Sequence, residues 1–339
     1  MSAPAFATSA DVAAALGSLS TPDSAAGDAA RSRQGQLTKP PGSLGRLEDL
    51  AIFFAGWQAR ERPRIDRGRA AIFAGNHGVA AHGVSAYPPA VTAQMVANFR
   101  NGGGAVNQLA TAAGLELHIV ALDLDRPTQD FTVTAAMTEA ECLSAFNAGA
   151  AIVEPDLDLI VVGEMGIGNT TSAAALAALS FGGDAAAWVG TGTGVDDAGL
   201  ARKCAAVERG VLLHGPSADT AFERLRRVGG REIAAIAGAV LRARHLRVPV
   251  LLDGFITCAA VAPLTVDAPG ITAHCLAGHC SAERGHERLL AHLGLDPLLR
   301  LGMRLGEGSG AAVAANIVRS ALAAHGGMAT FAEASVSGA

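Results

Sequence analysis

The sequence predicts an α/β fold: a parallel, six-stranded, Rossmann-like sheet flanked by helices, with a small helical domain formed by the N- and C-terminal segments. Short apolar runs rich in β-branched residues alternate with longer helical patterns along most of the 339 residues. Such continuous apolar runs are typical of parallel strands that are buried on both faces. Glycine-rich turns follow several of these runs. A chain of this length has room for one large domain and a smaller one.

Residues 1–60 are predicted to be a helical segment that belongs to the small domain. Ser9 is placed to cap one short helix, and Thr21 before Pro22 is typical of the start of a second. A pair of prolines then breaks the pattern, and Ser43 begins a third helix that runs to about residue 60.

The segment over residues 37–48 has two interpretations. It is either a connecting loop with a helix cap, which its prolines, glycines and serine favour, or a lid whose Lys39 or Arg46 faces an anion.

Residues 61–300 are predicted to form the α/β catalytic domain. Apolar runs with strand character lie at residues 69–74, 115–122, 158–162, 186–189, 248–252 and 271–275. Helical patterns fill the intervals, most clearly over 138–153 and after the glycine pair at 229–230. Residues 301–339 are predicted to hold a Gly-Glu-Gly turn, a helix to about residue 324 and a frayed tail.

The turn after the third run is the most informative stretch of the chain. It reads GEMGIGNTTS over residues 163–172 and leads into an Ala/Leu-rich helix, which Asn169, Thr170 or Ser172 can cap. The free N–H groups at such a helix start suit a phosphate or a carboxylate. Glu164 is unfavourable for holding an anion, so its presence predicts chemistry beside an anion site.

A second glycine-rich turn, at residues 190–194, leads into a helix that carries Lys203. Two such turns in one sheet, with a lysine behind one of them, predict a phosphate cradle. A second glutamate in a glycine-rich turn, Glu307, stands near the end of the chain. Paired carboxylates of this kind serve proton transfer and stabilise a developing positive charge.

Three further residues have both a functional and a structural interpretation. His77 follows the first strand, where open α/β sheets place ligands, and it is equally suited to be a structural hydrogen-bond anchor. Tyr87 and Met95 have the spacing to form a flat apolar pocket for an aromatic ring. Ordinary core packing explains the same two residues.

Several classes of function are disfavoured. A net charge of −5 provides no basic face for nucleic acid, and polar residues interrupt the longest uncharged stretch, so no membrane span is expected. The five cysteines are scattered, which favours a reducing compartment, and the N-terminus does not resemble a signal peptide; we therefore expect a cytoplasmic protein. The His/Cys-rich stretch at 273–286 matches no closed zinc pattern, so neither a metal nor a cofactor is expected. The first turn lacks the Gly-x-Gly-x-x-Gly of dinucleotide-binding enzymes.

Four segments in the same order along the chain resemble one known family. Residues 37–45, 163–171, 251–255 and 304–310 are similar to the motifs of nicotinate-nucleotide:dimethylbenzimidazole phosphoribosyltransferases. A set of this kind is far more specific than a single glycine-rich loop.

The resemblance implies a homodimer and a metal-free glycosyl transfer. Phosphoribose would move from nicotinate mononucleotide to 5,6-dimethylbenzimidazole, with inversion at C1′, giving α-ribazole 5′-phosphate and nicotinate. The residues that match the family's site are Glu307 as general base, Glu164 as the second acid, Gly166, Gly192, Lys203 and Ser281 around the phosphate, and Tyr87 and Met95 around the base. Two alternatives are a non-catalytic nucleotide sensor on the same scaffold and a metal-dependent hydrolase that uses the His/Cys-rich stretch.

Overall fold

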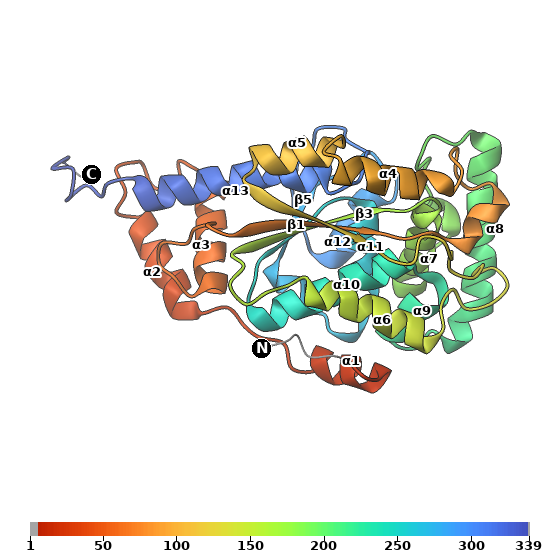
Figure 1. Ribbon diagram of the computed structural model, residues 1–339. Coiled ribbons are helices and arrows are strands. Elements are labelled where there is room, and N and C mark those ends of the chain that lie inside the picture. Colours follow the sequence, from red (N-terminus) through yellow and green to blue (C-terminus); the bar gives the residue numbers. More distant parts are fainter. Residues whose placement is uncertain (1–5, 338–339) are drawn as a thin grey trace.

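The computed structural model describes residues 6–337, and within that range six strands form one sheet (Figure 1). Neighbouring strands run parallel in the spatial order β2-β1-β3-β4-β5-β6. The strands are β1 (Gly68–Ala74), β2 (Leu115–Ala121), β3 (Leu159–Met165), β4 (Val250–Leu252), β5 (Cys275–His279) and β6 (Pro297–Leu299). The predicted fold class is confirmed.

The longest pairing joins β1 to β2 on one side and to β3 on the other. All seven residues of β1 are buried, because helices cover both faces of the sheet at this point. Ile72 lies opposite Gly163, and Phe73 lies opposite Glu164. The strand therefore extends beyond the predicted end at residue 162, and Glu164 belongs to β3 itself, not to the turn that follows.

Helices cover the sheet in two layers (Figure 1). One layer, drawn above the sheet, contains α4 (Ala90–Arg100), α5 (Ala105–Ala112) and α13 (Ser309–Gly327). The helices drawn below it are α6 (Glu139–Ala151), α7 (Asn169–Phe181), α9 (Ala221–Val228), α10 (Arg231–Leu246), α11 (Phe255–Asp267) and α12 (His286–Leu293). The long α8 (Asp197–His214) packs against α7 at one end of the molecule.

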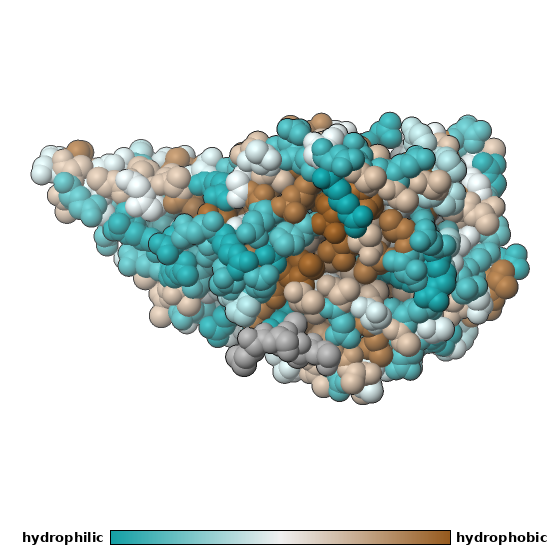
Figure 2. Space-filling model, viewed as in Figure 1, coloured by the Kyte–Doolittle hydropathy of each residue, from teal (hydrophilic) through white to brown (hydrophobic). Residues whose placement is uncertain are grey.

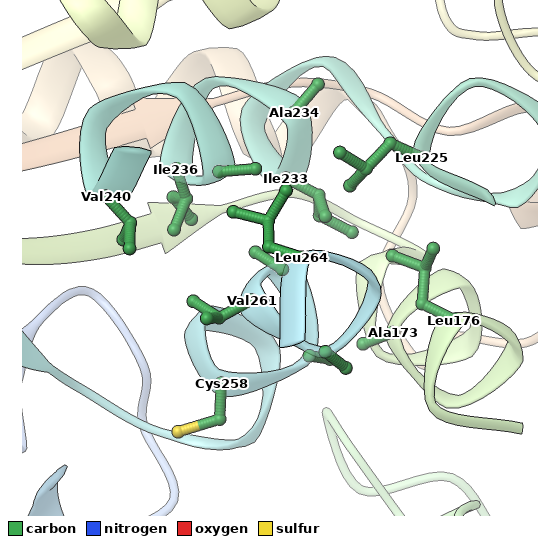
Figure 3. Packing of buried hydrophobic residues seen from close by; sticks show 14 of the residues in the cluster. Ala173, Leu176, Leu225, Ile233, Ala234, Ile236, Val240, Cys258, Val261 and Leu264 are labelled. Atoms are coloured by element: carbon green, nitrogen blue, oxygen red, sulfur yellow. The ribbon is translucent and has the colours of Figure 1, made fainter. Parts of the chain in front are cut away.

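The larger core lies between the sheet and the second layer (Figure 3). Aliphatic side chains of α10, α11 and α7 meet there, among them Ile236, Val261 and Leu176, each fully buried. Burial of this kind is the main contribution to stability, about 1.5–3 kcal/mol for each large aliphatic side chain.

The N-terminal helices pack beside the end of the chain. They are α1 (Ser9–Leu16), α2 (Ser24–Gln34) and α3 (Arg46–Gln58), and α3 lies against both α2 and α13 (Figure 1). Each predicted helix cap lies one or two residues from the observed one. A capping box at Thr8 starts α1, and the carboxylate of Asp23 starts α2. The caps are Thr8, Asp23 and Gly45, in place of Ser9, Thr21 and Ser43.

Two of the predicted strands are wrong. Residues 186–189 do not pair; this run overlaps a 3₁₀ turn (Ala185–Ala187), and only Trp188 and Val189 are buried, with the Trp188 ring 6.4 Å from that of Phe181. Residues 271–274 also form a 3₁₀ turn, and the strand begins only at Cys275. The sheet gains its sixth strand from β6, three residues that start with a proline and give no alternating pattern.

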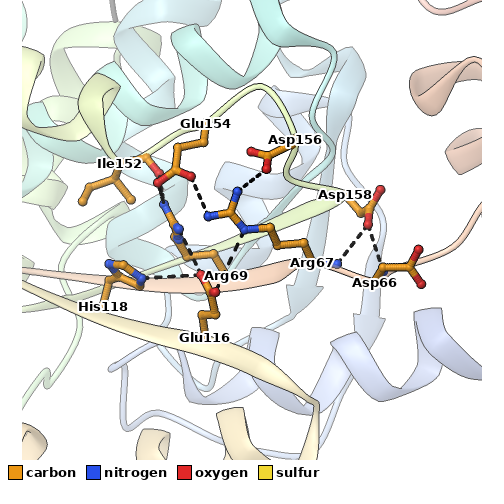
Figure 4. A network of polar contacts seen from close by, with 9 residues as sticks. All are labelled: Asp66, Arg67, Arg69, Glu116, His118, Ile152, Glu154, Asp156 and Asp158. Carbon is orange, nitrogen blue, oxygen red and sulfur yellow. Dashed lines mark hydrogen bonds and ion pairs between the residues drawn. The ribbon is translucent and has the colours of Figure 1, made fainter. Parts of the chain in front are cut away.

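A network of ion pairs joins the amino-terminal ends of β1, β2 and β3 (Figure 4). The Arg69 guanidinium donates to Glu154 at 2.8 Å and to Glu116 at 2.9 Å, and Arg67 pairs with Glu154 and Asp156. This edge is opposite to the one at which parallel sheets bind ligands, so we assign the network to the structure of the sheet.

In the part of the chain that the structure describes, no helix is long and apolar enough to cross a membrane.

Candidate functional site

Four acidic or basic side chains meet where the strands end. Glu164 is the last residue but one of β3, Asp253 follows β4, His279 ends β5, and Glu307 precedes the N-cap of α13, Gly308. The carboxyl ends of parallel strands lie at one edge of the sheet, which is the edge where open α/β sheets bind ligands. Each of the four side chains is buried.

Glu164 is an acid that is buried among other carboxyl groups. The side chain is 6% exposed, and one of its oxygens accepts a hydrogen bond from the Asn169 amide. Burial raises the pKa of Glu164 to about 8, and the neighbouring carboxyls of Asp253 and Glu232 contribute to the same shift. At neutral pH, with no ligand bound, this carboxyl is therefore mostly protonated.

Glu307 adopts a backbone conformation that non-glycine residues rarely have. Its φ is +62°, between Gly306 at +80° and Gly308 at +76°. A Cβ atom on Gly306 would lie 2.5 Å from the nearer Glu164 oxygen, so the Glu164 carboxyl lies against the backbone next to Glu307, and the charge of Glu307 contributes to the raised pKa of Glu164. Among residues 6–337 the Oε2 atom of Glu307 has no hydrogen-bond partner. Burial raises the pKa of this carboxyl, against the opposing effect of the Val106 N–H. An unpartnered buried carboxylate of this kind is suited to accept a proton.

Asp253 is buried beside both glutamates and bonds to backbone at the start of α13. Its carboxylate accepts hydrogen bonds from the N–H of Ala311 at 2.9 Å and of Gly308 at 3.2 Å. Burial raises the pKa of Asp253 to about 7 in spite of these bonds. Sequence reasoning gave Asp253 no role, although an aspartate directly after a buried strand is a recognisable signal for a residue at this edge.

The two predicted glycine-rich turns meet at Lys203. Its ammonium group donates to the Thr170 hydroxyl at 3.0 Å and to the Gly190 carbonyl at 2.6 Å. A Cβ atom on Gly192 would lie 2.9 Å from both the lysine nitrogen and the Thr170 hydroxyl, so only glycine leaves this corner open. Burial lowers the pKa of Lys203 to about 8. A buried lysine with glycine backbone around it suits a phosphate.

The sequence predicted that Asn169, Thr170 or Ser172 caps α7, and this prediction is wrong. These polar residues bond to site residues instead. The N-cap is Gly168, with φ +98°. Asn169 donates to Glu164, Thr170 accepts from Lys203, and Ser172 bonds to His77. The start of this helix is thus built into the site.

Ser281 lies in the turn after β5, close to Asp253. A Cβ atom on Gly254, the next residue after Asp253, would be 4.0 Å from the Ser281 hydroxyl. His286 holds Ser281 through its backbone N–H at 2.8 Å and its hydroxyl at 2.9 Å, both to Nδ1. The backbone donor fixes Nδ1 as an acceptor, and burial lowers the pKa of His286 to about 3, so the ring is neutral.

Gly166 lies at the junction of β1 and β3, where a Cβ atom would be 2.6 Å from the Gly75 carbonyl. Met95 is half-buried on α4, in a small cluster with Ile72 and Val106. Tyr87 is 55% exposed, in the segment before α4 that is tied to the Gly190–Gly194 turn through Thr193. None of these contacts joins Tyr87 to Met95, so the base pocket that they were predicted to form stays a prediction.

Three residues with open interpretations, His77, Lys39 and Arg46, make structural contacts. His77 is buried, and its two ring nitrogens bond to Ser172 at 2.9 Å and to Glu232 at 2.5 Å. Lys39 pairs with Glu48 at 2.7 Å, and Arg46 donates to the Pro297 carbonyl at 2.9 Å. The segment at 37–48 is therefore a connecting loop that is held in place by its cations.

The described residues contain no group of three or more His, Cys, Asp or Glu side chains arranged to hold a metal ion. In the His/Cys-rich stretch, His274 bonds to the carbonyls of Ile271 and Val240, at 3.0 Å each, so neither ring nitrogen is available as a ligand.

The carboxyl-terminal edge of the parallel sheet thus holds two buried glutamates, Glu164 and Glu307, and the start of α7 joins this edge to the Lys203 corner through Asn169 and Thr170. A family model described as "Phosphoribosyltransferase" matches residues 19–336, which gives the class.

Individual relatives define the family more narrowly. A nicotinate-nucleotide–dimethylbenzimidazole phosphoribosyltransferase of Novosphingobium aromaticivorans is 66% identical over 98% of each chain, and one of Ruegeria pomeroyi is 60% identical over 95% of each. A crystal structure of the enzyme of that name from Thermus thermophilus covers 94% of this chain and 100% of its own, with a TM-score of 0.86 at 40% identity. The chain belongs to the nicotinate-nucleotide–dimethylbenzimidazole phosphoribosyltransferase family.

Proposed function

We propose that this protein transfers phosphoribose from nicotinate mononucleotide to 5,6-dimethylbenzimidazole and releases nicotinate and α-ribazole 5′-phosphate. The observation that carries the proposal is the placement of two buried glutamates, Glu164 and Glu307, beside each other at the sheet edge that also holds the Lys203 corner. The relatives' names identify the reaction, and this arrangement supplies the chemistry for it.

Lys203 and the glycine-rich turns at its side are proposed to bind the 5′-phosphate. The ammonium group and the backbone around Gly190 and Gly192 form the corner. The backbone around Gly166 and the Ser281 side chain are proposed to complete the phosphate site. Hydrogen bonds to charged groups of this kind contribute about 1.5–3 kcal/mol each. Phosphate binding fixes C1′ of the ribose relative to the glutamates.

Bond breaking at C1′ needs no acid, because the leaving nicotinate carries a cationic pyridinium nitrogen that takes the bonding electron pair and becomes neutral. Positive charge then develops on the ribose ring. A carboxylate stabilises such charge strongly where water is excluded. Glu164 is placed for this role: approach of the cationic substrate favours its ionised form over the protonated form that burial favours in the free enzyme.

Glu307 is proposed as the general base. A benzimidazole nitrogen attacks C1′ from the face opposite to nicotinate, which inverts the configuration, and the ring becomes cationic and acidic at its other nitrogen. The free oxygen of Glu307 takes that proton. General-base catalysis contributes about 10²–10⁴-fold to rate. Met95 and Tyr87 are proposed to line the pocket for the base.

The test is a chromatographic and mass-spectrometric assay of purified protein with both substrates and a chelator present. We expect nicotinate and α-ribazole phosphate to appear together, and kcat to fall by about 10²–10⁴-fold in Glu307→Gln with little change in nucleotide affinity. Glu164→Gln is expected to lower kcat as well, whereas the exposed Glu208→Gln on α8 serves as a matched control with unchanged activity.

Binding of nicotinate mononucleotide without transfer to any aromatic base would overturn the proposal in favour of a nucleotide sensor. Loss of activity on chelation would favour the metal-dependent hydrolase.

We further infer that the protein is a homodimer in the cytoplasm. β2 is an edge strand whose Leu117, Ile119 and Val120 are only half-buried, and hydrophobic residues gather along the middle of that face (Figure 2). An exposed apolar edge of this kind is usually covered by a partner. Light scattering on a sizing column is expected to give twice the chain mass of 34.1 kDa; a monomer at all concentrations would contradict this inference.

A further inference from the structure

The helix that follows Glu307 starts without a side chain of its own to cap it. α13 has 19 residues, and its N-cap is Gly308, which brings no acceptor for the N–H groups of the first turn. Those N–H groups have no partner within the helix and carry the positive end of its dipole. A long buried helix with this arrangement requires an acceptor from elsewhere in the fold.

Asp253 is that acceptor, although it lies more than fifty residues earlier in the chain. Its Oδ1 accepts the Ala311 N–H at 2.9 Å, its Oδ2 accepts the Gly308 N–H at 3.2 Å, and the Gly310 N–H faces the same carboxylate. The side chain is 1% exposed, so these bonds are shielded from water. Asp253 therefore does for α13 what an N-cap residue does for an ordinary helix.

The backbone directly after Glu307 is fixed by this contact. Gly308 is held by Asp253 on one side and packs on Gly163 of β3 on the other, where a Cβ atom on Gly163 would lie 2.5 Å from the Gly308 nitrogen. Glu307 itself has a left-handed φ that side chains disfavour, so its conformation depends on the neighbours that hold it.

We propose that Asp253 is a positioning residue for Glu307, which keeps the left-handed turn before α13 in the conformation that aims the free carboxylate oxygen at the reacting base. This proposal rests on the proposed transferase function and on Glu307 as its general base. Asp253 itself exchanges no proton with either substrate.

The charged side chains around Asp253 explain why backbone N–H groups, and not a side chain, stabilise its carboxylate. Glu164 and Glu307 are the acids beside it, and His279 is the basic side chain, with Nε2 3.6 Å from Oδ1. That distance is too long for a hydrogen bond, and burial lowers the pKa of His279, so the ring stays neutral. The helix start of α13 is thus the main stabilising partner of the Asp253 carboxylate.

A double-mutant cycle between Asp253→Asn and Glu307→Gln tests the proposal. Asparagine has the same size but places an amide donor where one of the backbone N–H groups needs an acceptor. We expect Asp253→Asn to lower kcat by about 10- to 100-fold in the wild-type background, since misplacement of a catalytic group by about 1 Å costs this much. KM for nicotinate mononucleotide is expected to stay within about two-fold of the wild-type value, because the Lys203 corner is untouched.

In the Glu307→Gln background the same substitution is expected to lower kcat by less than about three-fold, because no base remains to be positioned. An equal loss in both backgrounds, or a loss that appears in KM, would overturn the role of Asp253 and leave the transferase function intact. Absence of transfer by the wild-type enzyme would instead remove the proposed function itself.

Hydrogen exchange provides a readout that is independent of activity. The backbone amides of residues 304–312 should exchange faster in Asp253→Asn, whereas those of α7 should be unchanged. If Asp253→Asn fails to fold, Asp253→Ser, which keeps one acceptor in a smaller side chain, enters the same cycle and the same exchange measurement. Unchanged exchange at 304–312 would show that Asp253 does not hold the turn.

Discussion

At the scale of single residues, the site holds an acid and a base whose charged forms are both disfavoured until substrate arrives. Burial raises the pKa of Glu164 to about 8 and lowers that of Lys203 to about 8. The phosphate of a nucleotide compensates the lysine charge, and the developing cation at C1′ compensates the carboxylate. Ligand binding is therefore expected to depend on pH through these two groups.

Of these two residues, Lys203 offers the sharper test of ligand binding, because its ammonium group is the proposed contact to the phosphate. Lys203→Met is expected to weaken binding of nicotinate mononucleotide by about 10- to 100-fold, the loss of one hydrogen bond to a charged group. In the wild-type protein, affinity should fall as pH rises through about 8, because the ammonium group then loses its proton. Calorimetric titrations at pH 7 and pH 9 measure both effects.

Arg209→Met, on the exposed face of the same helix, is the matched control for lost positive charge and is expected to bind normally. Equal affinities at pH 7 and pH 9 would show that Lys203 does not contact the phosphate through its charged form.

Local sequence patterns identified some of these site residues and missed others. Glu164, Lys203 and Glu307 were predictable because each lies in a glycine-rich stretch of sequence or in the helix that follows one. The position of Asp253 after a buried strand was a usable signal, but its role could not be predicted, because its partners are backbone N–H groups that the fold brings from residues 308–311. The ring contacts of His77 are hidden for the same reason, and sequence left its role open.

At the scale of elements, α6 and α10 cross at a distance that only glycine permits. A Cβ atom on Gly149 would lie 1.7 Å from the Ala235 carbonyl oxygen, and one on Gly238 would lie 2.0 Å from that of Phe146. The two helices then share one buried surface of small and aliphatic side chains. Glycine is tolerated inside both helices because close packing offsets its low helix propensity.

Gly238→Ala is expected to destabilise the protein by about 1–3 kcal/mol, because the added methyl group forces the two backbones apart. Gly27→Ala in α2 is the matched control: no atom lies within 4 Å of the new methyl group, so helix propensity alone should stabilise it by about 0.5–1 kcal/mol. Urea denaturation of both variants measures the two changes in the free energy of unfolding, which are expected to have opposite signs. Stabilisation by Gly238→Ala would mean that the helices are not in close contact at this crossing.

The elements that an apolar run or a cap marks were predictable, including β4, which has only three residues but lies in the apolar run at 248–252. Strands of seven residues, such as β1 and β2, stood out as apolar runs, and α6 was visible from its capping box at Thr138 and Glu141. β6 escaped notice because three residues carry no period and their pairing is set by β5 alone. The run at 186–189 was misleading because burial by side-chain packing resembles burial in a sheet.

At the scale of the whole molecule, the two edges of the sheet differ in how they handle charge. At the amino-terminal edge, acids and arginines neutralise one another in a partly exposed network (Figure 4). At the carboxyl-terminal edge, Glu164, Asp253 and Glu307 are buried together, and burial raises the pKa of each. The binding edge is therefore less stable than its packing alone would allow, as is common where substrate supplies the missing charge.

This asymmetry predicts how global stability changes with pH. Glu164 and Asp253 have folded-state pKa values near 8 and 7, above their ordinary values of 4.5 and 3.8, so the native state holds more protons than the unfolded state over that window. The free energy of unfolding must then fall as pH rises from about 6.5 to 8. His274 and His286 act in the opposite sense below about pH 7, because their pKa values fall from 6.5 to about 3, and Lys203 does so from about pH 8 upward, because burial lowers its pKa from 10.5 to about 8.

Urea denaturation at pH 6.5 and pH 8 tests this linkage directly. One buried acid with the shift of Glu164 loses up to about 2 kcal/mol of stability over this interval, at about 1.4 kcal/mol for each pH unit. Glu164→Gln removes the titrating group and should flatten the fall, whereas Glu208→Gln should leave it unchanged, because Glu208 is exposed on α8. An identical slope in Glu164→Gln and the wild-type protein would mean that Glu164 is ionised in the free enzyme, and the stabilisation of positive charge at C1′ would then start from a carboxylate already formed.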